Sequence, residues 1–241
     1  KNDFTGFAEA FRIMLTNIKF LIKDKKEGEA VVIMVSSSIK GEGKTTISTN
    51  TALTLAQNKK VLLIGADLRN PQLKRFTSHA KKGLSDFLAS NEDEATLESF
   101  IETSTLNPNL DILPSGTIPP NPTFLLSSTN MEKIYRALKS KYKYIVFDTA
   151  PMLLVSDSFH LIQYTDLLLY VMRADFTEID MLEVASEINA EHAEGKLAIV
   201  LNDVKNRNIS YYDKKYGYGY FSDDNKAKKG NEIFKWFKKF T

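Results

Sequence analysis

The sequence predicts a three-layer α/β fold, in which a mostly parallel central sheet carries helices on both faces. Short apolar runs rich in β-branched residues alternate with segments of helical periodicity, as repeated βαβ units require. The first run, residues 30–35, is apolar throughout and shows no polar alternation, which is typical of a strand buried on both faces. The chain of 241 residues is also long enough to bury a large core.

The expected elements follow one another along the chain. Residues 5–22 predict an amphipathic helix, because their apolar side chains recur about every 3.6 positions. Strands are expected over 30–35, 61–66, 110–113, 144–147, 167–172 and 197–201, and further helices over 44–57, 94–102, 122–139 and 179–190. Since ligands of parallel sheets bind beyond the carboxyl ends of the strands, functional residues are expected just after each strand.

The composition is that of an ordinary soluble globular protein, with 43% apolar and 26% charged residues. The absence of cysteine excludes disulfides, thiolate metal sites and a cysteine nucleophile. The longest apolar runs, such as residues 167–172, are far shorter than the ~20 residues of a membrane-spanning helix. Because the chain begins with Lys1, we expect a fragment of a longer protein, whose membrane anchor could lie upstream.

Charge is unevenly distributed along the chain. The net charge is +2, yet residues 205–241 hold 10 basic and 4 acidic residues, so the remainder is acidic. An acidic body argues against a broad nucleic-acid-binding surface. We therefore expect a body over residues 1–205 and a basic tail over residues 206–241, and no nucleic-acid partner.

A phosphate-binding loop follows the first predicted strand. Residues 36–46 read Ser-Ser-Ser-Ile-Lys-Gly-Glu-Gly-Lys-Thr-Thr, which fits the phosphate-loop pattern with serine in place of its first glycine. Backbone N–H groups and the positive end of the next helix would cradle phosphates, Lys44 would reach the β and γ phosphates, and Thr45 could ligate Mg²⁺. The position between a strand and a helix predicts a P-loop NTPase fold. The expected nucleotide-binding residues are Ser38, Lys40, Gly41, Glu42, Gly43, Lys44, Thr45 and Thr46, with Lys40 and Glu42 as solvated loop charges rather than catalysts.

Two aspartates follow other strands. Asp148, after strand 144–147, is placed to hold Mg²⁺ directly or through water, although a turn or helix cap is the alternative. Asp67, after the second strand, would face the same phosphates near the metal or the incoming nucleophile. Arg69 could contact phosphate or form a structural ion pair, for instance with Asp67. The candidate catalytic residues are Lys44, Asp67 and Asp148, and the candidate metal ligands are Thr45, Asp67 and Asp148.

These three segments resemble the Walker A, A-prime and B motifs of bacterial tyrosine kinases, the cytoplasmic kinase domains of polysaccharide co-polymerases. Further stretches that resemble the family are Glu9-Ala-Phe-Arg12 with Thr16-Asn17, Leu113-Pro-Ser-Gly116 with Pro119-Pro-Asn-Pro122, Val200-Leu-Asn202 and a tyrosine-rich tail. The resemblance implies subunit contacts through the first helix and a contact between Asn202 and adenine.

The sequence also departs from the family pattern at three positions. Gly65 stands where the family usually has a first aspartate, the candidate base for the tyrosine proton. Asp67 must then serve as the base, or activity is weaker or relies on another group. Leu15 replaces an arginine of the first-helix motif, which puts its part in ring assembly in doubt, and Phe124 stands where an acidic residue is common.

A tyrosine cluster lies in the tail. Its candidate phosphoacceptors, interleaved with glycine, are Tyr211, Tyr212, Tyr216, Tyr218 and Tyr220. In the family such clusters are phosphorylated by a neighbouring subunit, and each phosphate adds roughly −1.5 to −2 charges. The alternatives are rings packed on the body or stacked on nucleic acid. The basic, aromatic residues 226–240 could lie on a membrane or, as we slightly favour, form a helix packed on the body.

The resemblance implies an ATP- and Mg²⁺-dependent protein-tyrosine autokinase that regulates polysaccharide polymerisation and export. Its expected partners are further copies of itself, in a ring for example, a transmembrane activator on the same or a separate chain, and a phosphotyrosine phosphatase. The expected location is the cytoplasmic face of the cell membrane. One alternative is a partitioning-type ATPase, disfavoured by Ile39 at the position of that class's signature lysine. The other is a nucleotide-binding assembly module without kinase activity, which Gly65 keeps open.

Overall fold

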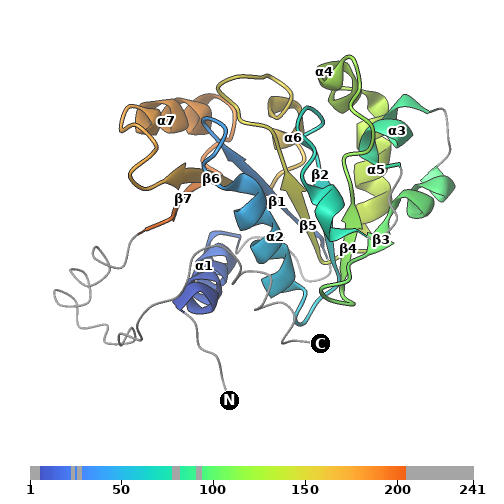
Figure 1. Cartoon of the computed structure of the whole chain (residues 1–241), viewed down its shortest axis with the longest axis horizontal. Coiled ribbons are helices and arrows are strands. Elements are labelled where there is room, and N and C mark those ends of the chain that lie inside the picture. The colour runs from blue at the N-terminus through green and yellow to red at the C-terminus, as the bar shows by residue number, and fades with distance from the viewer. Residues whose placement is uncertain (1–5, 23–24, 26–28, 78–81, 91–93, 205–241) are drawn as a thin grey trace.

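A computed structural model describes residues 6–22, 25, 29–77, 82–90 and 94–204. The described strands form one sheet in the order β3-β4-β2-β5-β1-β6-β7 (Figure 1). All neighbouring strands are parallel except β3, which pairs antiparallel with β4. The strands are β1 Val31–Ser37, β2 Val61–Gly65, β3 Glu102–Thr103, β4 Leu110–Leu113, β5 Tyr144–Asp148, β6 Leu167–Arg173 and β7 Leu197–Asn202.

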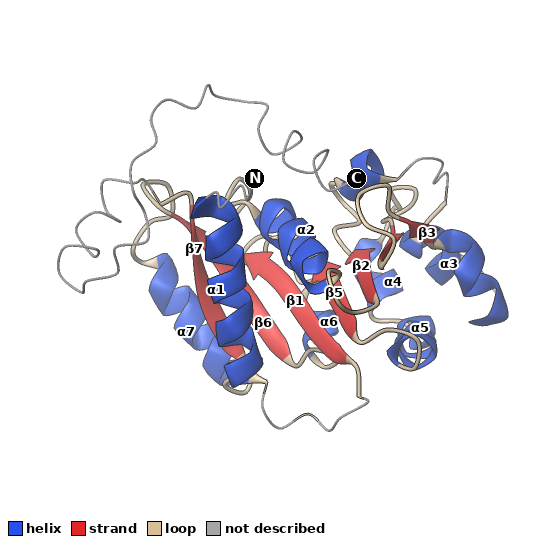
Figure 2. Ribbon diagram, turned by 90° about the horizontal axis from the view of Figure 1, so that it is seen from below, coloured by secondary structure: helices blue, strands red, loops and turns tan. Residues whose placement is uncertain are grey.

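Helices cover both faces of this sheet, as the sequence predicts. Helices α1 and α2 pack on one face, and α3 to α7 supply the apolar side chains that pack on the other (Figure 2). The α-helices are α1 Gly6–Leu21, α2 Lys44–Leu55, α3 Leu84–Ala89, α4 Pro122–Leu126, α5 Thr129–Lys139, α6 Phe159–Ile162 and α7 Met181–Glu191, and the 3₁₀ helices are η1 Leu73–Phe76 and η2 Glu94–Phe100. The described part of the chain contains no helix with the length and apolarity needed to span a bilayer.

Two predicted helices differ from the structure. Residues 94–102 form the 3₁₀ helix η2 and the start of β3, where Leu97 and Phe100 are both buried. Their spacing of three residues places them on one face of a 3₁₀ helix. The predicted helix 122–139 is divided into α4 and α5, because the hydroxyls of Ser127 and Ser128 bond to the carbonyls of Phe124 and Leu125 and end the first helix.

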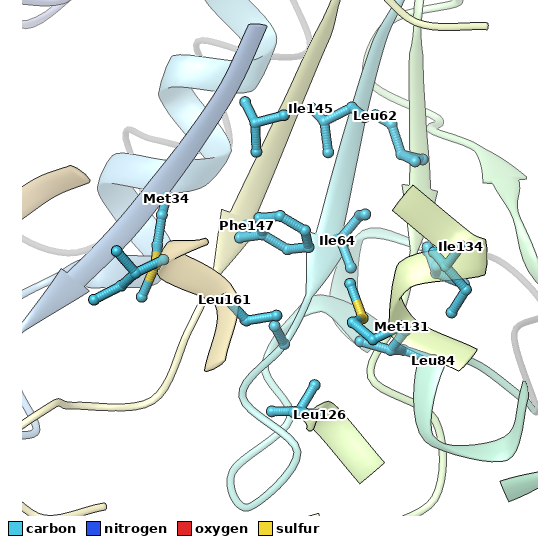
Figure 3. Close-up of a cluster of buried hydrophobic side chains, with 14 of the residues drawn as sticks. Met34, Leu62, Ile64, Leu84, Leu126, Met131, Ile134, Ile145, Phe147 and Leu161 are labelled. Atoms are coloured by element: carbon cyan, nitrogen blue, oxygen red, sulfur yellow. The ribbon is translucent and has the colours of Figure 1, made fainter. Parts of the chain in front are cut away.

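The strand β1 is buried along its whole length, and its side chains alternate between two cores. Val31, Ile33 and Val35 face α1 and α2, whereas Val32 and Met34 face the other helices. This is why its sequence shows no polar alternation. Figure 3 shows the core on the face covered by α3 to α7, where strand side chains pack against helix side chains. Among them are Met34, Leu62, Ile64, Ile145, Phe147, Met131, Ile134 and Leu161. The rigid sheet fixes the loops that leave its carboxyl edge.

Candidate active site

The three segments singled out in the sequence meet at the carboxyl edge of the sheet. Strand β5 lies between β2 and β1, and its last residue, Asp148, pairs in register with Gly65 and with Val35. The phosphate loop follows β1 directly, and the backbone N–H groups of Ala66 and Asp67 both donate to the carbonyl of Asp148, at 2.8 and 3.0 Å. The predicted convergence of these segments is therefore confirmed.

The phosphate loop leads directly into α2. Gly41 and Gly43 adopt φ angles of 97° and 103°, which residues other than glycine rarely adopt. A Cβ atom on Gly43 would also lie 2.1 Å from the side-chain nitrogen of Asn202. Lys44 is the first residue of α2, with Thr45 and Thr46 in the first turn. The N–H groups and dipole of this helix end favour a bound anion.

Lys44 is held close to this loop. Its side chain is buried, and its ammonium group donates to the Ser37 hydroxyl at 3.1 Å and to the Ile39 carbonyl at 3.4 Å. Burial lowers the pKa of Lys44, an effect that the negative charges of Asp148 and Asp67 partly offset. Because its partners here are uncharged, this buried ammonium group would be strongly stabilised by a charge-assisted hydrogen bond to a phosphate.

Asp148 and Thr45 present oxygen atoms to the same space. The Thr45 hydroxyl donates to Oδ2 of Asp148 at 2.9 Å, while Oδ1 is buried with no hydrogen-bond partner among the described residues. Burial raises the pKa of Asp148 to about 6, although hydrogen bonds from Thr45 and Ser48 oppose the increase. A buried carboxylate oxygen without a partner next to a hydroxyl oxygen fits Mg²⁺, which prefers hard oxygen ligands.

Asp67 lies in a turn directly after β2. Its Oδ1 accepts the backbone N–H groups of Arg69 and Asn70 at 3.2 and 2.9 Å, so Oδ2 is not needed to form this turn. Burial raises the pKa of Asp67, with these two hydrogen bonds opposing the rise. The carboxylate is thus fixed beside Asp148 and has a greater proton affinity than an exposed aspartate.

Arg69 forms a structural ion pair, but with a different partner from the one suggested by the sequence. Its guanidinium bonds both carboxylate oxygens of Asp157, at 2.6 and 3.1 Å, and Asp157 is almost fully buried. The Thr123 hydroxyl donates to the same carboxylate. The guanidinium therefore pairs with Asp157 rather than with Asp67, and a contact between Arg69 and phosphate stays a prediction. An acidic residue in the loop after β5 was the only sequence signal for this pair.

The prediction for the two loop charges is right for Lys40 and wrong for Glu42. Lys40 is exposed, whereas Glu42 is completely buried. The loop turns the Glu42 carboxylate inward, where it accepts the backbone N–H of Ile39 at 2.7 Å and the hydroxyl of Thr177. Hydrogen bonds of this charge-assisted kind compensate for burying the carboxylate.

The remaining predicted site residues also lie at this edge, except for the tail. Ser38 accepts a hydrogen bond from the hydroxyl of the fully buried Tyr170, at 3.0 Å. Asn202, at the end of β7, donates its amide N–H to the carbonyl of Glu42 at 2.9 Å. The residues Tyr211, Tyr212, Tyr216, Tyr218 and Tyr220 lie outside the described residues. Sequence reasoning did not identify Asp157, Tyr170 or Thr177.

Gly65 has a steric reason to be glycine. A Cβ atom there would lie 2.5 Å from the hydroxyl and 2.9 Å from the backbone nitrogen of Ser115, a buried residue of the loop after β4. We expect Gly65→Ala to lower the free energy of unfolding by about 1–3 kcal/mol, through overpacking. Urea denaturation measures this change.

A double-mutant cycle with Ser115→Ala provides the control. This second substitution removes the nearest atom, so it should recover part of the stability lost by Gly65→Ala. If the two changes in stability simply add, the contact between residues 65 and 115 does not explain the glycine.

Comparison with known proteins agrees with this geometry. A family profile described as an AAA domain matches residues 30–206. The tyrosine-protein kinase CpsD of Streptococcus agalactiae is 35% identical over 214 residues, which cover 88% of this chain and 89% of that protein. The tyrosine-protein kinase ptk of Acinetobacter johnsonii is 34% identical over 214 residues, which cover 88% of this chain but 28% of that longer protein.

A solved structure is similar as well. The crystal structure of the VpsO kinase domain matches with a TM-score of 0.68 and 33% identity, covering 82% of this chain and 96% of that domain. The sheet, the phosphate loop and the two strand-end aspartates thus occur in a chain whose similarity to tyrosine kinases extends over most of its length. The chain belongs to the family of bacterial tyrosine-protein kinases and has their P-loop NTPase fold.

Proposed function

We propose that this protein is an ATP- and Mg²⁺-dependent autokinase that phosphorylates its own tyrosine-rich tail. The observation that carries the proposal is the convergence of Lys44, Thr45, Asp67 and Asp148 at one edge of the sheet, in a member of this family. The acceptors would be the tail tyrosines at positions 211, 212, 216, 218 and 220, presented by a neighbouring subunit.

One part of the site would bind ATP, the phosphoryl donor, through its phosphates. The N–H groups of the phosphate loop and the Lys44 ammonium would stabilise charge on the β and γ phosphates. The Thr45 hydroxyl and the Asp148 carboxylate would hold Mg²⁺. When bound, the metal ion neutralises part of the charge on the transferring phosphoryl group. Asn202, which lies beside the loop, is the proposed adenine contact.

Asp67 is the proposed general base. A tyrosine oxygen forms a bond to the γ phosphorus, the bond from this phosphorus to the β–γ bridging oxygen breaks, and ADP leaves. The phenolic proton passes to Asp67, whose Oδ2 does not take part in the turn at residues 67–70. Because burial raises the pKa of Asp67, this carboxylate is a stronger base than an exposed aspartate.

The biological setting is proposed by analogy with the relatives. The kinase would act at the cytoplasmic face of the membrane, in a homo-oligomer that regulates polysaccharide polymerisation and export. A transmembrane activator and a phosphotyrosine phosphatase would be its partners. The match to CpsD covers most of that relative and the match to ptk covers 28% of that one, so we propose an activator either on a separate chain or on the same chain.

A mixing experiment tests transfer between subunits. One protein carries Lys44→Met with an intact tail, and the other has an intact phosphate loop with the five cluster tyrosines replaced by phenylalanine. The two are incubated together with Mg-ATP and radiolabelled γ phosphate. Label on the Lys44→Met chain supports transfer between subunits. If the wild type is labelled but this mixture is not, transfer occurs within one chain, and if neither is labelled the assembly-module alternative replaces the kinase.

The raised pKa of Asp148 predicts how stability depends on pH. Its folded-state pKa of about 6 exceeds the ordinary aspartate value of 3.8, so the folded protein binds this proton more tightly than the unfolded chain does. This contribution to stability is complete below pH ~4 and is lost as pH rises through ~6, amounting to about 3 kcal/mol. Urea denaturation of the nucleotide-free protein between pH 4.5 and 7.5 should show about 2 kcal/mol of this change.

The variant Asp148→Asn is the control for this pH dependence, because its amide does not titrate. The stability of the wild type relative to this variant should fall as pH rises from 4.5 to 7.5. Parallel pH profiles for the two proteins would show that Asp148 keeps an ordinary pKa in the folded state.

A further inference from the structure

The buried carboxylate of Glu42 joins the phosphate loop to another part of the sheet. Its Oε2 accepts the backbone N–H of Ile39 within the loop, and its Oε1 accepts the hydroxyl of Thr177. Thr177 lies between β6 and α7, and its oxygen also accepts the backbone N–H of Arg173 at 2.8 Å. A carboxylate oxygen only accepts hydrogen bonds, so the Thr177 hydroxyl donates its proton to Glu42 while its oxygen accepts from Arg173.

Other contacts join the ends of β6 and β7 to Gly41 and Glu42 of the loop. The Arg173 guanidinium donates to the carbonyl of Gly41 at 3.3 Å and is itself held by Asp203 at 3.0 Å. The Asn202 amide donates to the carbonyl of Glu42. We call the side chains of Arg173, Thr177 and Asn202 the β6–β7 clamp.

The clamp acts where the loop has least conformational restraint of its own. Gly41 and Gly43 flank Glu42, and glycine has the largest backbone freedom to lose on ordering. Fixing a flexible residue costs conformational entropy, and a loop that is already ordered before the ligand binds avoids this cost on binding. The N–H groups that would face the phosphates belong to this stretch, so its order should determine nucleotide affinity.

We propose that Thr177 is a positioning residue for the nucleotide, acting through Glu42 to hold the phosphate loop in its phosphate-binding conformation. This inference rests on the proposed nucleotide site and extends it to residues outside the Walker segments. Thr177 need not touch the nucleotide, so its loss should weaken binding and raise the KM for ATP while kcat stays close to that of the wild type.

Two substitutions of one residue separate the hydroxyl from the rest of the side chain. Thr177→Val keeps the shape and removes the hydroxyl, whereas Thr177→Ser keeps the hydroxyl. We expect Thr177→Val to raise the Kd for Mg-ADP, measured by calorimetry, about tenfold, as for loss of a hydrogen bond to a charged group. Thr177→Ser should bind within about twofold of the wild type. Equal binding by wild type and Thr177→Val, or equal weakening in both variants, would overturn the proposal.

Thr103→Val is a matched control for general loss of stability. Thr103 also donates its hydroxyl to a carboxylate, that of Asp111, at 2.8 Å, but in the β3–β4 pair at the outer edge of the sheet. The Thr103→Val variant should have a lower thermal unfolding temperature and an unchanged Kd for Mg-ADP. If Thr177→Val does not fold, Glu42→Gln gives the same test, because an amide cannot accept both hydrogen bonds at once.

The binding measurement is independent of phosphoryl transfer. A wild-type protein that binds Mg-ADP but forms no phosphotyrosine would refute the proposed kinase activity, while the comparison of the two Thr177 variants would still decide the positioning role. If the wild type autophosphorylates and Thr177→Val has an unchanged KM for ATP, the positioning role is refuted and the kinase is not.

Discussion

Replacing Lys44 with methionine is expected to lower the rate of tyrosine phosphorylation by about 10²- to 10³-fold. Methionine has a similar length and fits a buried position, so the change removes mainly the charge that faces the phosphates. The ammonium group of Lys44 bonds only neutral oxygens within the described chain, so its electrostatic effect remains available to the γ phosphate. Initial rates of phosphotyrosine formation in Mg-ATP measure the loss.

Lys59→Met is the corresponding control, because Lys59 is exposed in the turn after α2. It should leave the rate unchanged. Thermal unfolding of both variants shows whether they are folded. A folded Lys44→Met protein that keeps more than about a tenth of the wild-type rate would contradict the role given to this lysine, since that corresponds to less than about 1.4 kcal/mol of transition-state stabilisation.

Replacing Asp67 with asparagine should lower kcat by about 10²- to 10⁴-fold, the usual contribution of a general base. The asparagine side-chain oxygen can still accept the N–H groups of Arg69 and Asn70, so the turn should persist and only the basic group is lost. The affinity for Mg-ADP should change much less than kcat. Rapid-mixing measurements of a single turnover, with binding by calorimetry, separate the two effects.

The pH profile provides an independent check on Asp67. In the wild type, kcat should fall at acidic pH as Asp67 takes up a proton, at a pH above the range of an exposed aspartate because burial raises its pKa. Asp67→Asn should lose this acidic limb. A variant with wild-type kcat would exclude Asp67 as the base and move the search to another group near the γ phosphate.

The central strands could be predicted from the sequence because they are buried on both faces. Residues 110–113 were predicted with the bounds that the structure has, four other predicted strands differ by one residue at one end, and 30–35 differs from β1 by one residue at its start and two at its end. The elements missed were short. The helices α3 and α6 have six and four residues, and β3 has two, too few for a hydrophobic period to be recognised.

The Walker segments could be predicted for a different reason, since each lies directly after a strand and therefore at one edge of the sheet. The partners of Arg69 and Glu42 could not. Asp157 is 88 residues from Arg69, and Thr177 is 135 residues from Glu42. Only the folded chain brings such distant residues together, so no local pattern could show that Glu42 is buried or that Arg69 forms its ion pair with Asp157.

Mass spectrometry of the tail after incubation with Mg-ATP is the direct test of autophosphorylation. The 241-residue wild type and its Lys44→Met variant are compared, with peptides covering residues 205–241. We expect phosphate on one or more of the tyrosines in 211–220 in the wild type and none in Lys44→Met, which would also show that Gly65 is compatible with activity. An unmodified tail in a wild-type protein that binds ATP would refute the proposed autokinase activity and favour a nucleotide-binding assembly module.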